Sequence, residues 1–394
     1  MRFYILQIPY LARASELAAL ARARAEAPGQ RVPPVDPKQL VGASRERFAV
    51  MLAEMTDQVR LAEQLGYHGV CWTEQHFQAE GVEVNTNPVL YGAHMIANTT
   101  TMRVGQLGIP LPCHNPLQVA EDLALLDHMA QGRTFVGFSR GNTPRYMNTL
   151  GQKLGSVAAT SDKSASDEFN RELMKESWLI IKKAWTEPLV AHRGAVWQVP
   201  PPGIPLEFPP SLDVGGVGSD AGELTAVTVV PRPFQEPHPP LYTVFSFSMT
   251  TARFWAEQGA TLVSFVDNPD FWRTTLGVYR DHAARAGFTD VPPGRALAAG
   301  GHLVTQRSAA RAERYAEEFR WLFEYAYNCP PYNVPVGRLF GGTGRDAYEQ
   351  VARLHDELGV DEVFLWHHVN CFDRDAEREA LEEFGEHVVA RLRD

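Results

Sequence analysis

The sequence predicts a closed α/β barrel of eight parallel strands, the (β/α)8 or TIM-barrel fold, as a single domain over residues 1–394. Short apolar segments of strand character alternate with helical segments about eight times, and this alternation is typical of a parallel sheet. Eight such units favour closure into a barrel over an open sheet. An open sheet that binds a dinucleotide would carry G-x-G-x-x-G after its first strand, and this sequence has no such motif there.

Composition excludes several classes of function. The net charge of −10 argues against a nucleic-acid or anionic-membrane surface, which would need clustered Lys and Arg. The four cysteines lie far apart with no C-x-x-C, which favours a reducing cytoplasm over a disulfide scaffold or a zinc site. No apolar run approaches the roughly 18 residues of a membrane span. We therefore expect a cytoplasmic protein without membrane or nucleic-acid partners.

The first third of the chain holds two predicted strands and an insertion. Strand one is predicted at Phe3–Ile8, because its apolar run is too short and interrupted for a signal peptide. Residues 10–44 form an insertion after this strand, with a short Ala/Arg-rich helix and a loop. A solvated decoration, a dimer contact and an active-site lid all remain open for it. A helix at 45–65 leads to strand two at 70–72, and Pro88 opens the next helix.

The stretch 103–141 has the pattern strand, helix, strand. Apolar residues predict strand three over 104–109, and prolines end it. Asn115 can cap a helix and Pro116 can occupy its first position. Strand four is predicted at Thr134–Ser139.

The second half continues the alternation around a second insertion. Residues 200–240, before strand five, hold eleven of the 28 prolines, which predicts a loop and not a domain. The remaining elements are predicted as a helix at 169–185, strands at 241–246, 261–266, 296–305 and 361–366, helices at 249–258, 271–286, 308–325, 343–358 and 376–392, and a loop at 326–340.

Four runs of sequence, at 66–77, 104–141, 240–250 and 341–343, resemble the luciferase-like flavin-dependent monooxygenases. The resemblance covers most of the chain apart from the two insertions. It implies an enzyme that uses reduced FMN and O₂ to oxygenate a small organic substrate through a flavin C4a-hydroperoxide. It also implies a separate flavin reductase that supplies FMNH₂, and a homodimer by analogy.

Three residues after strand two are the candidate catalytic group. Glu74 and His76 offer a carboxylate and an imidazole for acid–base or orienting roles. Family members usually have Glu-His-His here, with the first His beside the reacting flavin, and this chain has Gln75 at that position. We expect Gln75 to position the flavin species and His76 to titrate. A purely structural hydrogen bond remains the alternative for His76.

Candidate ligands of the flavin phosphate follow strands four and five. Arg140 supplies a cation, Arg171 could add a second, and Ser248 and Thr250 could add hydroxyl and N–H donors at a helix start. The resemblance implies that these positions hold the phosphate. A salt bridge is the alternative for a lone arginine in such a place.

The resemblance also assigns residues around the flavin ring. Leu107 and Gly108 match a non-proline cis peptide beneath the ring. Ser139 matches a position where some relatives carry a cysteine. Ser246 and Phe247, at the end of strand five, are expected beside the flavin, where a bulky Phe247 would reshape the pocket.

The end of strand eight is expected to reach the substrate. Trp366 and His367 are the candidate substrate-pocket residues. The adjacent pair His367–His368 suggests a metal site, but neighbours on a strand point to opposite faces and no companion ligands lie at suitable spacing. We therefore expect no metal.

Two other functions stay open. The deazaflavin coenzyme F420 could replace FMN on the same barrel for hydride transfer without O₂. Alternatively, Gln75 in place of histidine could mark a non-catalytic flavin-binding protein.

Overall fold

The computed structural model describes residues 1–26, 36, 40–213, 217–218, 222–245, 248–330 and 332–393, and only the backbone of Phe245. The chain folds into two compact units. Unit 1 comprises Met1–Gly108, Phe135–Gly137 and Leu241–Asp394, and unit 2 comprises Ile109–Thr134 and Phe138–Pro240. The expectation of a single domain stays a prediction.

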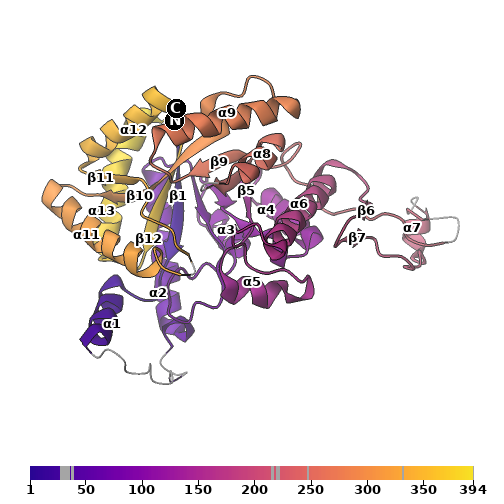
Figure 1. Ribbon diagram of the computed structural model, residues 1–394, viewed down its shortest axis with the longest axis horizontal. Helices are drawn as coiled ribbons and strands as arrows, with labels where there is room; N and C mark the ends of the chain where they lie inside the picture. Colours follow the sequence, from indigo (N-terminus) through magenta and orange to yellow (C-terminus); the bar gives the residue numbers. More distant parts are fainter. Residues whose placement is uncertain are drawn as a thin grey trace. The chain divides into compact units, whose positions relative to one another are not determined.

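Unit 1 contains a closed barrel of eight parallel strands, which confirms the predicted fold (Figure 1). The strands pair in the order β1–β2–β3–β5–β8–β9–β10–β12, and β12 pairs with β1. They are β1 (Arg2–Pro9), β2 (Gly69–Trp72), β3 (Arg103–Gln106), β5 (Thr134–Ser139, of which 135–137 belong to this unit), β8 (Leu241–Phe245), β9 (Thr261–Ser264), β10 (Leu297–Thr305) and β12 (Glu362–Val369). An additional strand, β11 (Leu339–Gly342), pairs with the carboxyl half of β10 and begins at the end of the loop expected over 326–340.

Aromatic side chains fill the barrel interior. The rings of Tyr4 and Phe364 stack with centroids 4.7 Å apart, and Phe135 meets Tyr242 edge-on at 5.3 Å. All four side chains are buried, so the barrel has a packed core and no pore. Because side chains two residues apart share a face, this layer also defines which residues of each strand face inward.

The predicted helices of unit 1 at 45, 88, 249, 271, 308, 343 and 376 begin within two residues of these positions, whereas α10 was not predicted. The helices of this unit are α1 (Ala14–Glu26), α2 (Arg45–Gln64), α3 (Pro88–Ile96), α8 (Met249–Glu257), α9 (Pro269–Arg285), α10 (Pro293–Ala296), α11 (Ala309–Ala326), α12 (Gly344–Leu358), α13 (Arg374–Phe384) and α14 (Ala390–Leu392), with a 3₁₀ turn at Val41–Ala43. Ser308 caps α11 by accepting the Arg311 amide, and Thr343 forms a capping box with Asp346 on α12. Helices α11, α12 and α13 lie beside β10 and β11 (Figure 1).

One predicted helix of unit 1 is interrupted. The expected helix at 376–392 ends at Phe384, and a π-helical turn at Gly385–Val389 separates α13 from α14. A Cβ atom on Gly385 would lie 2.9 Å from the Leu65 side chain, so this turn packs closely on the end of α2. The two ends of the chain also meet here, because the Met1 ammonium donates to the Leu392 carbonyl at 2.8 Å.

Unit 2 contains the helices that follow β4 and β5 in the chain, together with the second insertion. Its elements are β4 (Ile109–Pro110), α4 (Pro116–Met129), the end of β5, α5 (Pro144–Leu150), α6 (Ala165–Thr186), the hairpin β6 (His192–Arg193) and β7 (Gln198–Val199), α7 (Pro209–Asp213), and 3₁₀ turns at Leu111–Cys113 and Gly151–Lys153. Asn115 caps α4 by accepting the Leu117 amide at 3.0 Å, as predicted. Helices α4 and α6 are tied by the Trp185 indole N–H, which donates to the Ala120 carbonyl at 3.0 Å.

Two expectations changed in this region. The strand expected over 104–109 is divided, because β3 ends at Gln106 and β4 pairs separately with the end of β5. The polar stretch before α6 contains the unpredicted helix α5.

The second insertion is mostly irregular where it is described, as predicted, and α7 is its helix. Its end is fixed to the unit by Asp127, whose carboxylate accepts the Gln235 amide at 2.8 Å. No helix within the described ranges is both long and apolar enough to cross a membrane.

Candidate functional site

Glu74 and His76 form a hydrogen-bonded pair just past the carboxyl end of β2. The Nε2 atom of His76 lies 2.8 Å from Oε1 of Glu74. Glu74 is 5% exposed, whereas the His76 side chain keeps 19% of its surface. A buried carboxylate that orients a partly exposed imidazole is an arrangement able to hold and transfer a proton. Gln75, between them, donates its backbone N–H to the Asn85 carbonyl at 2.8 Å.

The loop that carries this pair also contains a buried carboxyl group that the sequence did not indicate. Glu83 is 3% exposed, and its Oε1 accepts the Thr73 hydroxyl at 3.0 Å. Burial raises the pKa of Glu83 to about 7, against a smaller lowering by Thr73. An acidic residue in a loop is ordinarily solvated, so the position of Glu83 in the sequence did not indicate that its carboxyl group is buried.

The end of β12 corrects one expectation. The Nε2 atom of His367 lies 3.1 Å from Oε1 of Gln58 on α2, so His367 faces the helix layer and does not line a pocket with Trp366. The reason is that neighbouring side chains on a strand point to opposite faces. Burial lowers the pKa of His367 to about 3, so its ring is neutral.

Trp366 shares the interior face of β12 with Phe364. Its ring lies 5.1 Å from the His302 ring and remains partly exposed. Its Nε1–H group is buried and bonds to none of the described residues. An aromatic face with an available donor is suited to an organic ligand, so the expectation that Trp366 contacts substrate stays a prediction.

The same interior face holds an unpredicted group of rings. The His368 ring lies 5.3 Å from Tyr10, whose hydroxyl is hydrogen-bonded to that of Tyr327. Burial holds the pKa of His368 well below its ordinary value, and its neighbours His302 and His367 lower it further. These residues come from β10, from β12 and from the segments that directly follow β1 and α11, so only folding reveals their proximity.

The N-terminus of α8 has the predicted form. Ser248 caps it by accepting the Thr251 amide at 3.4 Å, and Thr250 is exposed in the first turn. The first N–H groups of a helix lack intrahelical acceptors and attract anions. The Leu107–Gly108 peptide is cis, as the resemblance implied. Ser246 and Phe247 lie outside the described residues.

In unit 2, Arg140 and Arg171 meet one carboxylate. Arg140 pairs with Asp167 and donates from Nε to Oδ1 of Asn170 at 2.9 Å. Arg171 Nη2 lies 3.3 Å from Oδ2 of Asp167. Burial raises the pKa of Asp167, but the Ser161 amide and Arg140 outweigh this effect and lower it overall.

This ion pair is the salt bridge that the sequence allowed as the alternative to a phosphate-binding role for Arg140. Its Nη1 group forms no hydrogen bond to a described residue, so donor capacity remains for an anion. Ser139, the last residue of β5, is partly exposed beside it in the chain. Contact of these residues with a flavin stays a prediction.

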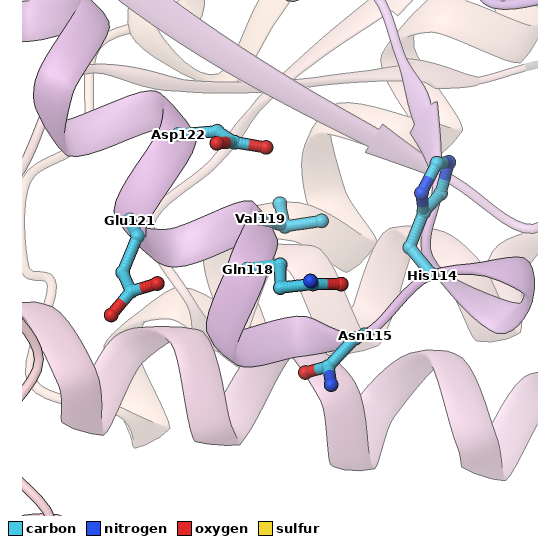
Figure 2. Close-up of a pocket in the computed structure, with 6 residues that line it drawn as sticks. All are labelled: His114, Asn115, Gln118, Val119, Glu121 and Asp122. Carbon is cyan, nitrogen blue, oxygen red and sulfur yellow. The ribbon is translucent and has the colours of Figure 1, made fainter.

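A separate pocket of about 310 Å³ opens at the start of α4 in unit 2 (Figure 2). It is lined by His114, Asn115, Gln118, Val119, Glu121 and Asp122. None of these is a predicted site residue, and both acidic side chains on it are exposed.

Together, the closed parallel barrel and the polar groups at its carboxyl ends define an α/β-barrel protein with the site position typical of barrel enzymes. The family model described as luciferase-like monooxygenase matches residues 36–229. The match agrees with the sequence relatives, and the resemblance found in the sequence is confirmed.

Relatives of known name or structure agree with the family. The 3,6-diketocamphane 1,6-monooxygenase of Pseudomonas putida is 25% identical over 285 residues, covering 71% of this chain and 70% of its own. The solved oxygenating constituent of 3,6-diketocamphane monooxygenase from the same species, in complex with FMN, has TM-score 0.68 at 18% identity over 91% of this chain and 97% of its own.

A structure with a different cofactor shares the fold. An F420-dependent secondary alcohol dehydrogenase has TM-score 0.60 at 14% identity over 87% of this chain and 96% of its own. The fold alone is thus common to flavin and deazaflavin enzymes.

Proposed function

We propose that the protein is a flavin-dependent monooxygenase that uses reduced FMN and O₂ to oxygenate a small organic substrate, with FMNH₂ supplied by a separate flavin reductase. The observation that carries the proposal is the Glu74–His76 pair, 2.8 Å apart, at the carboxyl end of a luciferase-like barrel strand. The diketocamphane monooxygenase relative and the FMN-bound structure support the cofactor and the reaction class.

The residues present suit a flavin. The available N–H groups at the start of α8, with Ser248 and Thr250, suit a phosphate. The partly exposed Trp366 ring and its buried Nε1–H suit an aromatic ligand. Leu107, Gly108, Ser139, Arg140 and Arg171 are further proposed contacts, which rest on the resemblance. When bound, reduced flavin would supply the electrons that activate O₂.

Within this proposal each residue of the β2 loop has a role. His76 accepts or donates a proton at Nδ1, while Glu74 orients the ring through Nε2. Gln75 offers an amide for positioning. The buried surroundings of Glu74 limit access of water to the pair.

A matched pair of histidine variants tests this assignment. We expect His76→Ala to lower the product formed per O₂ consumed by about tenfold or more, because positioned acid–base groups contribute roughly 10²- to 10⁴-fold. His282→Ala is the control, since His282 pairs with Glu257 at 2.7 Å between α8 and α9. Wild-type coupling in His76→Ala would make His76 structural.

The cofactor is tested by mixing the purified protein with reduced FMN and then oxygenated buffer. A stopped-flow absorbance transient that is distinct from oxidised FMN, and shortened by substrate, is the expected result. Oxidation at the rate of free FMN would remove the monooxygenase proposal.

The deazaflavin alternative is favoured by the shared fold of the F420-dependent dehydrogenase. Hydride transfer to deazaflavin without O₂ uptake would select this alternative.

The remaining alternative is a non-catalytic protein, which binding of one flavin per chain without turnover would favour. Light scattering of the purified protein checks the proposed homodimer.

A further inference from the structure

The loop between β2 and α3 encloses a continuous chain of hydrogen bonds. The Gln75 backbone N–H donates to the Asn85 carbonyl at 2.8 Å, and the Asn85 side-chain amide donates to Thr73 Oγ1 at 2.8 Å. The Thr73 hydroxyl then donates to Glu83 Oε1 at 3.0 Å. The chain therefore runs from the buried Glu83 carboxyl group to the peptide between Glu74 and Gln75, next to His76.

Glu83 is held from outside the loop as well. The Val84 amide donates to the Pro9 carbonyl at 2.9 Å, and the Gly81 carbonyl accepts the Leu11 amide at 2.7 Å. These bonds attach both sides of Glu83 to the end of β1, so its carboxyl group has a fixed position relative to the barrel. The Thr73 hydroxyl has a single hydrogen. Because Thr73 Oγ1 accepts a hydrogen bond from the Asn85 side-chain amide, this hydrogen is donated to Glu83.

We propose that Glu83 is a positioning residue for the Glu74–His76 pair, acting through Thr73 and Asn85. The inference rests on the proposed function for what the pair does. Glu83 does not touch the pair, so its action is to fix the backbone that carries both side chains.

The surroundings of Glu83 favour its neutral form. Among the described residues no cation acts on it, and burial with the Thr73 hydroxyl accounts for its pKa of about 7. The titratable groups that face it are Tyr10, directly after β1, and Tyr327, directly after α11. Burial raises both of their pKa values well above 10, so neither ionises near neutral pH.

Ionisation of Glu83 should therefore loosen the loop above about pH 7. The Thr73 hydroxyl is the one donor to this carboxyl group among the described residues, and it does not offset the burial of a charge. The ionised group therefore draws water into the loop, and the backbone hydrogen bond from Gln75 to Asn85 opens more often. Glu83→Gln keeps an acceptor for Thr73 and cannot ionise. It should keep the loop ordered at alkaline pH, whereas Thr73→Val breaks the chain at every pH.

Hydrogen exchange of the flavin-free protein tests this inference independently of any activity. Exchange of the peptide that carries Gln75, corrected for the intrinsic rate, is compared at pH 6 and pH 8.5. In the wild type it should rise roughly 2- to 10-fold, the equivalent of one hydrogen bond. Glu83→Gln should remove this rise, and Glu80→Gln, which changes an exposed carboxylate of the same loop, should keep it.

Infrared spectra give a second readout. A protonated carboxyl band that is present at pH 6 and absent in Glu83→Gln is expected. If that band is missing, or if wild type and Glu83→Gln show the same exchange at both pH values, the inference is overturned.

The pH profile of oxygenation separates this inference from the proposed function. Product per O₂ should fall above pH 7 in the wild type and stay level in Glu83→Gln. Identical profiles would refute the positioning role. Absence of all turnover, with the exchange result as expected, would refute the proposed function and leave Glu83 as a determinant of loop order.

Discussion

Glu83 in unit 1 and Asp167 in unit 2 are both buried carboxyl groups, yet their partners set opposite charge states. Glu83 is 3% exposed and accepts a hydroxyl, and its pKa is raised to about 7. Asp167 has no exposed surface and pairs with Arg140 and Arg171, and its pKa is lowered. Burial alone favours the neutral form, and cations with amide donors reverse it.

The difference separates two tasks. The Asp167 cluster keeps a fixed charge and holds the guanidinium of Arg140 in one orientation. Glu83 lies in a loop with the proposed acid–base pair and changes charge near neutral pH. The permanent ion pair with Asp167 suits Arg140 as a cation that binds an anion. A neutral carboxyl group at Glu83 suits a loop that must stay ordered without a counter-ion.

The largest expected effect comes from removing the anion of the ion pair. Asp167→Ala removes the buried carboxylate that Arg140 and Arg171 share and should lower the free energy of unfolding by about 3–5 kcal/mol. Urea denaturation measures it. Glu168→Ala is the control, because Glu168 is half-exposed and lies 3.4 Å from Arg171 Nε. Its cost should be about 0–1 kcal/mol.

The pH dependence of this effect has a definite sign. The pKa of Asp167 is lowered from 3.8, so its contribution is present above pH 3.8 and is lost as the pH falls through the folded value. The difference between wild type and Asp167→Ala should shrink in acid. An equal difference at every pH would mean that the carboxylate is not stabilised by its arginines.

The contribution of Glu83 to the free energy of unfolding should depend on pH in the opposite sense to that of Asp167. Its size should be somewhat smaller. Its pKa is raised from 4.5 to about 7, so its contribution is complete below pH 4.5 and is lost as the pH rises to 7. The unfolding free energy of the wild type relative to Glu83→Gln should fall by about 3 kcal/mol over this range. Denaturation at pH 4.5 and 8 measures it, with Glu80→Gln as control. A constant difference would mean that Glu83 is solvated.

Glu377 is an intermediate case between Glu83 and Asp167. Its carboxylate accepts the backbone amides of Asn370, Cys371 and Phe372 at 2.9, 2.7 and 2.8 Å, while burial raises its pKa to about 7. Glu377→Gln places an amide N–H against these donors and should cost about 1–3 kcal/mol. The denaturation midpoint measures it.

The control for Glu377 is Asp375→Asn, because Asp375 is exposed in the first turn of the same helix. A change of less than about 0.5 kcal/mol is expected there. If Glu377→Gln changes the free energy of unfolding as little as Asp375→Asn does, three amide donors do not substitute for an arginine. Glu377 is then protonated in the folded protein.

Local features of the fold were predictable because they depend on residues close in the chain. Asn115, Ser308 and Thr343 cap their helices as expected, since a cap needs only an amide two or three residues ahead. The barrel strands followed from apolar runs, and the family resemblance identified the Glu74–His76 region. The Pro-rich composition of residues 200–240 correctly indicated a loop for the described part.

The missed features depend on distant neighbours. β11 forms because it pairs with the free half of β10, and the last helix is interrupted where it packs on α2. His367 faces α2 because the register of β12 against β1 decides which side chains enter the barrel. A single sequence does not contain that register.

The sequence by itself determined the alternation of strands and helices, the caps, and the residue types at the ends of the strands, because periodicity and short-range hydrogen bonds decide them. The tertiary structure decided charge and direction: which face His367 takes, and which buried carboxyl group is ionised. These depend on burial and on partners far along the chain, such as Arg140 for Asp167, and on the lack of any cation acting on Glu83 among the described residues.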